Sequence, residues 1–77
     1  MQNITGNRIR LARHNLNITQ EELAARLQLA GLKHTRNTIA KIEIGIRQVT
    51  DIEVKVLAQV LGVSISWLYG ENVDENH

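Results

Sequence analysis

The feature that most constrains the fold of this chain is a helix-start signal that recurs along it. A Ser or Thr stands where it can cap a helix, with one apolar residue directly before it and another four positions after it. The hydroxyl accepts a hydrogen bond from a free backbone N–H, and the apolar pair packs across the start of the helix. The complete signal occurs at Thr5, Thr19, Thr50 and Ser64. It predicts a chain of short helices.

Further signals refine the ends of these helices. Glu22 follows Thr19 by three residues, and Glu53 follows Thr50 by three, so each pair predicts a capping box. A residue that tolerates a left-handed backbone stands where each of the five helices should end, namely Asn17, Gly31, Gly45, Gly62 and Gly70. Together the signals predict an all-α fold with helices over residues 6–15, 20–30, 36–44, 51–61 and 65–69.

The start of the helix predicted over residues 36–44 differs from the other four. Thr35 has Ile39 four positions later, but the residue before this cap is the polar His34. At the other starts an apolar residue fills that position and faces neighbouring protein. We therefore expect the start of the 36–44 helix to face solvent or a ligand and to be the most exposed of the five. An ordinary surface helix is the alternative interpretation.

Apolar residues at helical spacing predict the core. They are Ile9, Leu16, Ile18, Leu23, Ala24, Leu27, Leu32, Ile39, Ile42, Val54, Leu57, Ala58, Leu61, Val63, Trp67 and Leu68. The 77 residues suit one small domain, which we expect over residues 1–70, followed by an acidic and disordered tail over 71–77.

Composition excludes several classes of protein. The chain has no cysteine, so neither a disulfide nor a cysteine-based zinc site can hold the fold. No membrane-spanning run and no signal-peptide pattern is present, so we expect a cytoplasmic protein. The histidines lack metal-ligand spacing and no catalytic motif occurs. We expect no enzyme activity, no cofactor and no metal.

Charge is distributed unevenly along the chain. Residues 1–50 carry eight Lys or Arg and three Glu, a net charge of +5, whereas residues 51–77 carry one Lys and five acids, a net charge of −4. This division favours an anionic partner for the first part, although uneven scatter of surface charge would give the same count. The helices predicted over 20–30 and 36–44 also form a pair of the kind that lays its second helix in the major groove of DNA.

These segments, in this order, resemble the Cro/repressor-type helix-turn-helix domain, also called lambda-repressor-like or XRE-type. The matching segments are Ile9-Arg10 with Arg13, Ile18 to Ala24, Thr38 to Glu43 with Gly45, and Leu61 to Ser64 with Trp67-Leu68. The resemblance covers about residues 6–70. It implies a compact five-helix domain that binds double-stranded DNA. It also implies that Arg13 and Glu43 form a structural ion pair, and that Gln20 binds a phosphate and braces a side chain at the start of the 36–44 helix.

The side chains suited to reading bases lie on one face of that helix. Arg matches guanine, Asn matches adenine, and the spacing of these residues aligns them. We predict base contacts from Arg36, Asn37, Thr38 and Lys41. We predict phosphate contacts from Thr19, Gln20, Lys33, His34, Arg8, Arg10 and Arg47.

The chain departs from the family pattern at two places. The segment between the two helices is about five residues longer than usual, which we interpret as an extra turn closed by Gly31, with Leu32 in the core and Lys33 and His34 beside the DNA. Ile44 and Ile46 stand where the family commonly has polar or basic residues. We expect Ile46 to close a Schellman-type contact, and Ile44 to meet a thymine methyl group, a partner chain or nothing.

The predicted function is that of a small transcriptional regulator, a repressor that binds a palindromic operator as a homodimer. The candidate dimer surface consists of Trp67, Leu68, Tyr69 and Val73. The alternative is a protein-binding module on the same fold, such as an antitoxin or an anti-repressor, with weak or no DNA binding.

Overall fold

The computed structural model describes residues 3–71, which fold into five helices. They are α1 (Ile4–Asn15), α2 (Gln20–Leu29), α3 (Arg36–Ile44), α4 (Asp51–Leu61) and α5 (Ile65–Leu68). No strand occurs within residues 3–71. The predicted all-α, five-helix fold is confirmed. Val73 of the predicted dimer surface, and all of the predicted tail after Glu71, lie outside the described residues.

The hydroxyl caps begin four of the helices as predicted. Thr19 and Thr50 each form a full capping box with the glutamate three residues later. Thr35 Oγ1 accepts a hydrogen bond from the backbone N–H of Thr38, and Ser64 Oγ accepts one from that of Trp67. Asn17 and the predicted glycines have positive φ angles, as helix-closing residues require.

The predicted start of the first helix was wrong. Asn3, not Thr5, is the N-cap residue of α1, and its side chain makes no capping hydrogen bond. The Asn3 amide instead donates to the carbonyl oxygen of Glu43 at 2.9 Å, at the far end of α3. Gly6 permits this close approach, because a Cβ atom there would collide with the carbonyl oxygen of Ile42. The start of α1 is therefore set by its contact with α3.

The core contains side chains from all five helices, and its largest fully buried members are Ile9, Leu23, Leu27, Ile39, Ile42, Leu57, Leu68 and Val54. Three predicted core residues, Leu32, Val63 and Trp67, are only partly buried. Leu16 was predicted wrongly, since it is 42% exposed. It lies in the turn after α1, where helical periodicity no longer directs the side chain inward. Ala12, which was not predicted, takes a place in the core.

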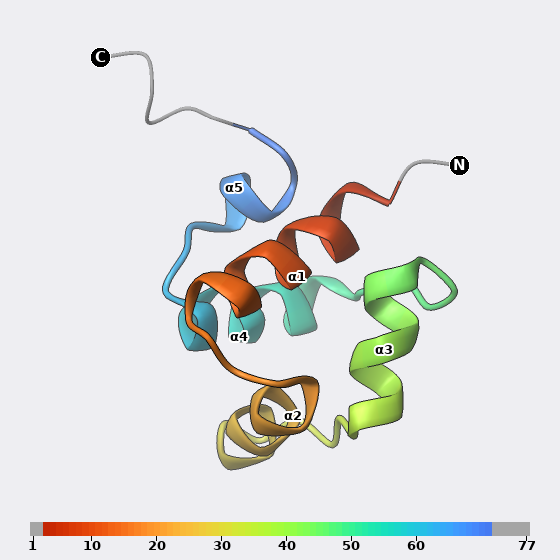
Figure 1. Cartoon of the computed structure of the whole chain (residues 1–77). Helices are drawn as coiled ribbons and strands as arrows, with labels where there is room; N and C mark the ends of the chain where they lie inside the picture. The colour runs from red at the N-terminus through yellow and green to blue at the C-terminus, as the bar shows by residue number, and fades with distance from the viewer. Residues whose placement is uncertain (1–2, 72–77) are drawn as a thin grey trace.

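The arrangement of the helices leaves α3 at one edge of the molecule (Figure 1). It packs against α1 and α2, whereas α4 packs against α1, α2 and α5. One side of α3 is therefore held by protein while the other side remains uncovered. Among the described residues, no helix combines the length and the apolar character needed to cross a membrane.

Candidate nucleic-acid interface

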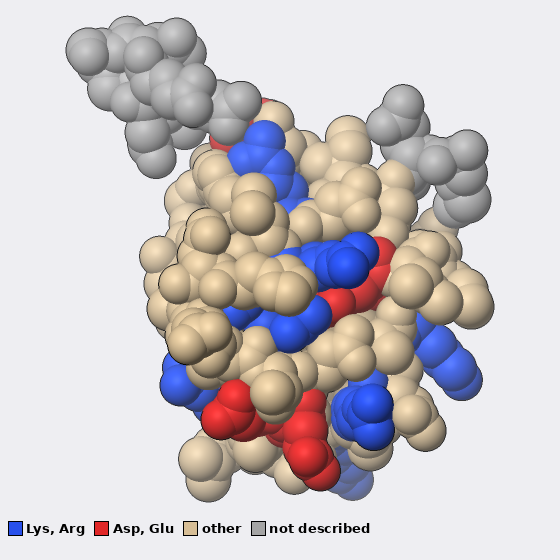
Figure 2. Space-filling view, viewed as in Figure 1, with Lys and Arg blue, Asp and Glu red and all other residues tan. Residues whose placement is uncertain are grey.

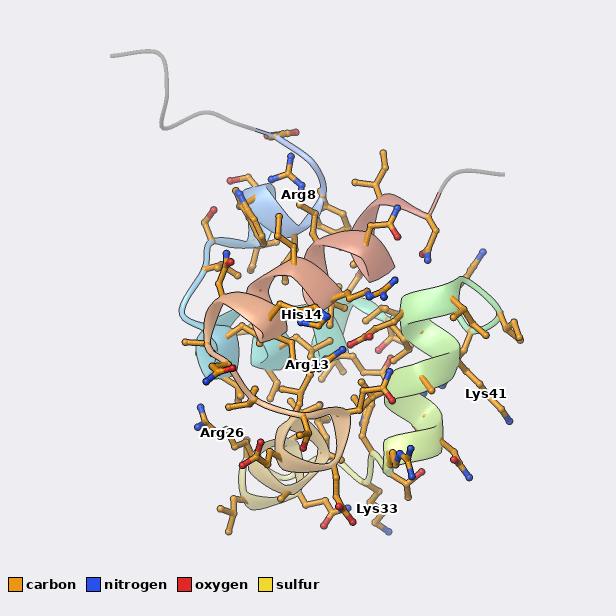
Figure 3. The ribbon with its side chains drawn as sticks, viewed as in Figure 1. Arg8, Arg13, His14, Arg26, Lys33 and Lys41 are labelled. Atoms are coloured by element: carbon orange, nitrogen blue, oxygen red, sulfur yellow. The ribbon has the colours of Figure 1, made fainter. Side chains whose placement is uncertain are left out.

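The uncovered side of α3 carries the side chains that were predicted to read bases. Arg36, Asn37 and Lys41 are exposed, and Thr38 is partly exposed. In Figure 3, Lys41 points away from the body of the protein. The Thr38 hydroxyl lies 3.1 Å from that of Thr35, so it already makes a hydrogen bond with the N-cap residue of α3. Ile39 and Ile42 are buried on the inner side of the same helix, so α3 has a polar outer face and an apolar inner face.

A buried ion pair fixes this helix to α1. Arg13 Nε donates to Glu43 Oε2 at 2.8 Å, and Arg13 Nη2 donates to Glu43 Oε1 at 3.0 Å. The third guanidinium nitrogen, Nη1, donates to the carbonyl oxygen of Ile18 at 2.9 Å. Two parallel bonds of this kind set both distance and orientation. Arg13 and Glu43 thus form the structural pair that the resemblance implied.

Gln20, the first residue of α2, joins the same pair. Its side-chain amide donates to Glu43 Oε1 at 3.1 Å. We expected Gln20 to brace the start of α3, but the amide instead bonds to a residue near the end of that helix. The reason is that Glu43 is turned inward toward Arg13, where Gln20 can reach it. Glu43 therefore connects three helices through one carboxylate.

The N-terminus of α2 opens beside the start of α3. Thr19, Gln20 and Glu21 line a shallow hollow together with Arg13 and Arg36. The free N–H groups and the positive end of the dipole at a helix N-terminus favour a bound anion. A phosphate group in this hollow would lie between the start of α2 and the first residue of α3.

His34 does not face a ligand, so the expectation of an exposed position and a phosphate contact was wrong. Its side chain is only 4% exposed, and Nε2 lies 3.0 Å from Glu53 Oε2 of α4. This nitrogen has no well-aligned hydrogen-bond partner in the described part of the chain. Burial lowers the pKa of His34; Glu53 opposes this shift, and Arg47 adds to it. The position before a helix cap faces the protein here too, although its occupant is polar.

Arg47 also meets Glu53. Arg47 Nη2 donates to Glu53 Oε2 at 2.7 Å, and Arg47 Nη1 donates to Glu53 Oε1 at 3.1 Å. The Arg47 hydrogen bonds are the main reason that the pKa of Glu53 is lowered to about 2. The same bonds raise the pKa of Arg47. Arg47, predicted as a phosphate contact, is thus paired with an internal carboxylate, while its side chain remains 37% exposed.

The family described as Helix-turn-helix matches residues 9–68. The chain belongs to the helix-turn-helix family. No curated protein and no solved structure is similar enough to count as a match. The family is that of the XRE and lambda-repressor-like domains, which confirms the resemblance, and it is a family of DNA-binding regulatory domains.

In this helix-turn-helix protein the segment between α2 and α3 is long, as the sequence indicated. Helix α2 ends at Leu29, one residue before the predicted end, and Gly31 follows with a φ of +101°. The backbone N–H of Leu32 bonds to the carbonyl oxygen of Leu27, and Gln28 donates to that of His34. These bonds order the segment and leave Lys33 exposed just before α3.

The exit from α3 is apolar and exposed. The backbone N–H of Ile46 bonds to the carbonyl oxygen of Lys41, which is the Schellman bond expected there. Its side chain nevertheless remains 72% exposed and that of Ile44 66% exposed. The predicted apolar contact of Ile46 is therefore not made within the described residues.

The remaining predicted site residues lie in different places. Arg10 is exposed on α1. The Arg8 guanidinium lies 4.6 Å from the centre of the Trp67 ring, next to α5 and far from Lys41 on α3 (Figure 3). Leu68 is fully buried, so it cannot form part of a dimer surface, whereas Tyr69 is 46% exposed. The hydrophobic staple after Ser64 directs Leu68 into the core.

Charge on the molecular surface is mixed in Figure 2, where basic side chains lie along the α3 edge and an acidic group lies near α2. Within the described residues no group of His, Asp and Glu side chains could hold a metal ion. The residue that sequence reasoning missed is Glu53. It was identified only as a helix cap, and no local signal indicated that His34 and Arg47 would converge on it.

Proposed function

We propose that this protein binds double-stranded DNA in a sequence-specific manner, with α3 in the major groove. The observation that carries the proposal is the division of α3 into two faces. Arg36, Asn37 and Lys41 are exposed on the outer face, while Glu43 on the inner face is tied to Arg13 and Gln20. A reading helix needs both free polar side chains and a fixed orientation. Thr38 completes the proposed base-reading set.

The proposed phosphate contacts surround this helix. Thr19 and Gln20 stand at the N-terminus of α2, which favours an anion, and Lys33 is exposed before α3. Arg10, exposed on α1, adds a further cation. Arg8 already has a partner in Trp67, and Arg47 has one in Glu53. We therefore assign phosphate binding to Thr19, Gln20, Lys33 and Arg10.

We further propose that the protein acts as a repressor and binds a palindromic operator as a homodimer in the cytoplasm. One chain carries a net charge of only +1, so two subunits would double the number of phosphate contacts. Trp67, which is partly buried, and the exposed Tyr69 remain as candidates for the dimer surface. Half-sites would then be separated by about one turn of DNA.

Selection of bound duplexes from a random pool tests the proposal. Enrichment of an inverted repeat is expected. Asn37→Ala should relax the preference at one or two base pairs, by about tenfold, because a bidentate contact contributes about 1–3 kcal/mol. Gln59→Ala, which removes an exposed amide from α4, is the matched control and should leave the preference unchanged.

Two results would contradict this assignment. An equal loss of affinity for every sequence in Asn37→Ala would exclude Asn37 as a base reader. Failure of the pool to enrich any duplex would favour the protein-binding alternative, an antitoxin or anti-repressor type of module.

A further inference from the structure

One carboxylate, that of Glu53, joins the two residues that flank α3. His34 stands two positions before the first residue of α3, and Arg47 stands three positions after the last. Both side chains contact Glu53 Oε2, at 3.0 Å and 2.7 Å. The helix between them has nine residues and is therefore about 13 Å long. Its two ends are thus held at a single point on α4.

This arrangement exceeds what helix capping requires. The Glu53 carboxylate accepts a hydrogen bond from the Thr50 backbone N–H at 2.9 Å, which completes the capping box. Glu22 makes the same bond to Thr19 at the start of α2, yet Glu22 is exposed. Capping therefore does not explain why Glu53 is buried or why a histidine and an arginine converge on it.

We infer that Glu53 is a positioning residue for base recognition, holding both ends of α3 through Arg47 and His34, and that protonation of His34 releases the N-terminal end. The inference rests on the proposed function and names a pH-dependent control of the same site. Arg36 and Asn37 follow His34 by two and three residues. Movement of His34 would therefore displace the proposed base readers first.

The sign of the pH effect follows from the groups around the imidazole. Burial opposes a charged His34 most strongly, and Glu53 on α4 favours it. Arg47, which follows α3 and already pairs with the Glu53 carboxylate, opposes a second positive charge there. From α2, the neutral amide of Gln28 holds only the backbone carbonyl of His34. The net result is a pKa below the ordinary value of 6.5. The stability that neutral His34 supplies is complete above pH 6.5 and is lost as the pH falls through the lowered pKa. Acid therefore favours conformations in which His34 has left its site.

The first test compares two variants at the same position of two capping boxes. Glu53→Gln keeps the size of the side chain and an acceptor for the cap, but removes the charge that holds Arg47. Glu22→Gln makes the same change at an exposed glutamate whose hydrogen bonds go to Thr19 and not to a residue that flanks α3. The ratio of affinities for the selected duplex and a random duplex should fall at least about fivefold in Glu53→Gln and remain unchanged in Glu22→Gln. An equal ratio in the two variants would overturn the inference.

The second test uses pH and does not depend on Glu53→Gln folding. The affinity ratio of the unaltered protein should fall severalfold between about pH 7.5 and about pH 5.5, the range over which histidines titrate. His34→Gln should abolish this fall, whereas His14→Gln, at an exposed histidine on α1, should retain it. A ratio that does not change with pH, or that falls equally in His34→Gln, would overturn the inference.

A readout on the free protein separates this inference from the proposed function. Backbone amide NMR signals of residues 36–44 should shift with the titration of His34 and should not do so in His34→Gln. If these amides do not shift, the inference fails even if a duplex is selected. If they shift but no duplex is selected, the positioning of α3 by Glu53 and His34 stands and the proposed DNA binding fails.

Discussion

The first turns of α2 and α4 are built from the same local pattern but have different environments. Glu22 accepts from Thr19 N at 2.7 Å, and Glu53 accepts from Thr50 N at 2.9 Å. The hydrogen bonds to Thr19 lower the pKa of Glu22, whereas the bond from Arg47 is the largest cause for Glu53. Glu22 is exposed, and Glu53 is 7% exposed.

The difference teaches that a capping box can serve two purposes. At α2 it begins the helix at the surface and leaves the N-terminus beside Arg36 open to an anion. At α4 the same box brings a carboxylate into the interior, where it connects α4 to the segments on both sides of α3. Local hydrogen bonding begins both helices, but only the second box contributes to tertiary structure.

If burial and bonding partners determine how much a carboxylate contributes to the free energy of unfolding, Glu43 should contribute even more than Glu53. Glu43→Ala leaves Arg13, which is 8% exposed, without its partner. Removal of one member of a buried ion pair costs about 3–5 kcal/mol. Urea unfolding should show a loss of this size. Glu21→Ala, at an exposed glutamate of α2, is the control, and a loss at Glu43 no greater than the control value would contradict the argument.

Acid unfolding should separate the two capping-box glutamates. The pKa of Glu53 is about 2 in the folded protein, against an ordinary value of 4.5. Its stabilisation is therefore complete above pH 4.5 and is lost as the pH falls towards 2, a contribution on the order of 3 kcal/mol. The unaltered protein should be more stable than Glu53→Gln above this range, and the difference in their unfolding free energies should shrink as the pH falls through it. For Glu22→Gln the difference from the unaltered protein should change much less with pH. An equal loss of the difference in both variants would contradict the assignment.

The hydroxyl caps should be equivalent in the two regions, because their hydrogen bonds are local. Thr19→Ala and Thr50→Ala should each lower the unfolding free energy by about 1 kcal/mol. Thr5→Ala should cost less than about 0.5 kcal/mol, because Thr5 lies inside α1 and caps no helix. Thermal unfolding of the three variants measures these changes. A Thr5 variant as unstable as the other two would restore Thr5 as a cap.

Particular residues show how far the sequence could be interpreted. The starts of α2, α3, α4 and α5 were predicted to the residue, because each hydroxyl bonds to an N–H three positions later. Thr5 carried the same signal, yet α1 begins earlier because Asn3 bonds to Glu43, forty residues away. The resemblance implied the Arg13–Glu43 pair correctly, and composition alone could not have done so.

His34 marks the limit of local reasoning. Its polar character indicated exposure, and its position before a cap indicated burial; only the presence of Glu53 decided between them. The sequence determined where the helices lie, which face of α3 is apolar, and which family the chain belongs to, since these depend on neighbouring residues and on order along the chain. Tertiary structure alone decided that Glu22 stays at the surface while Glu53 holds both ends of α3. The partners of Glu53 stand six and nineteen residues away, so only the packing of the helices brings them together.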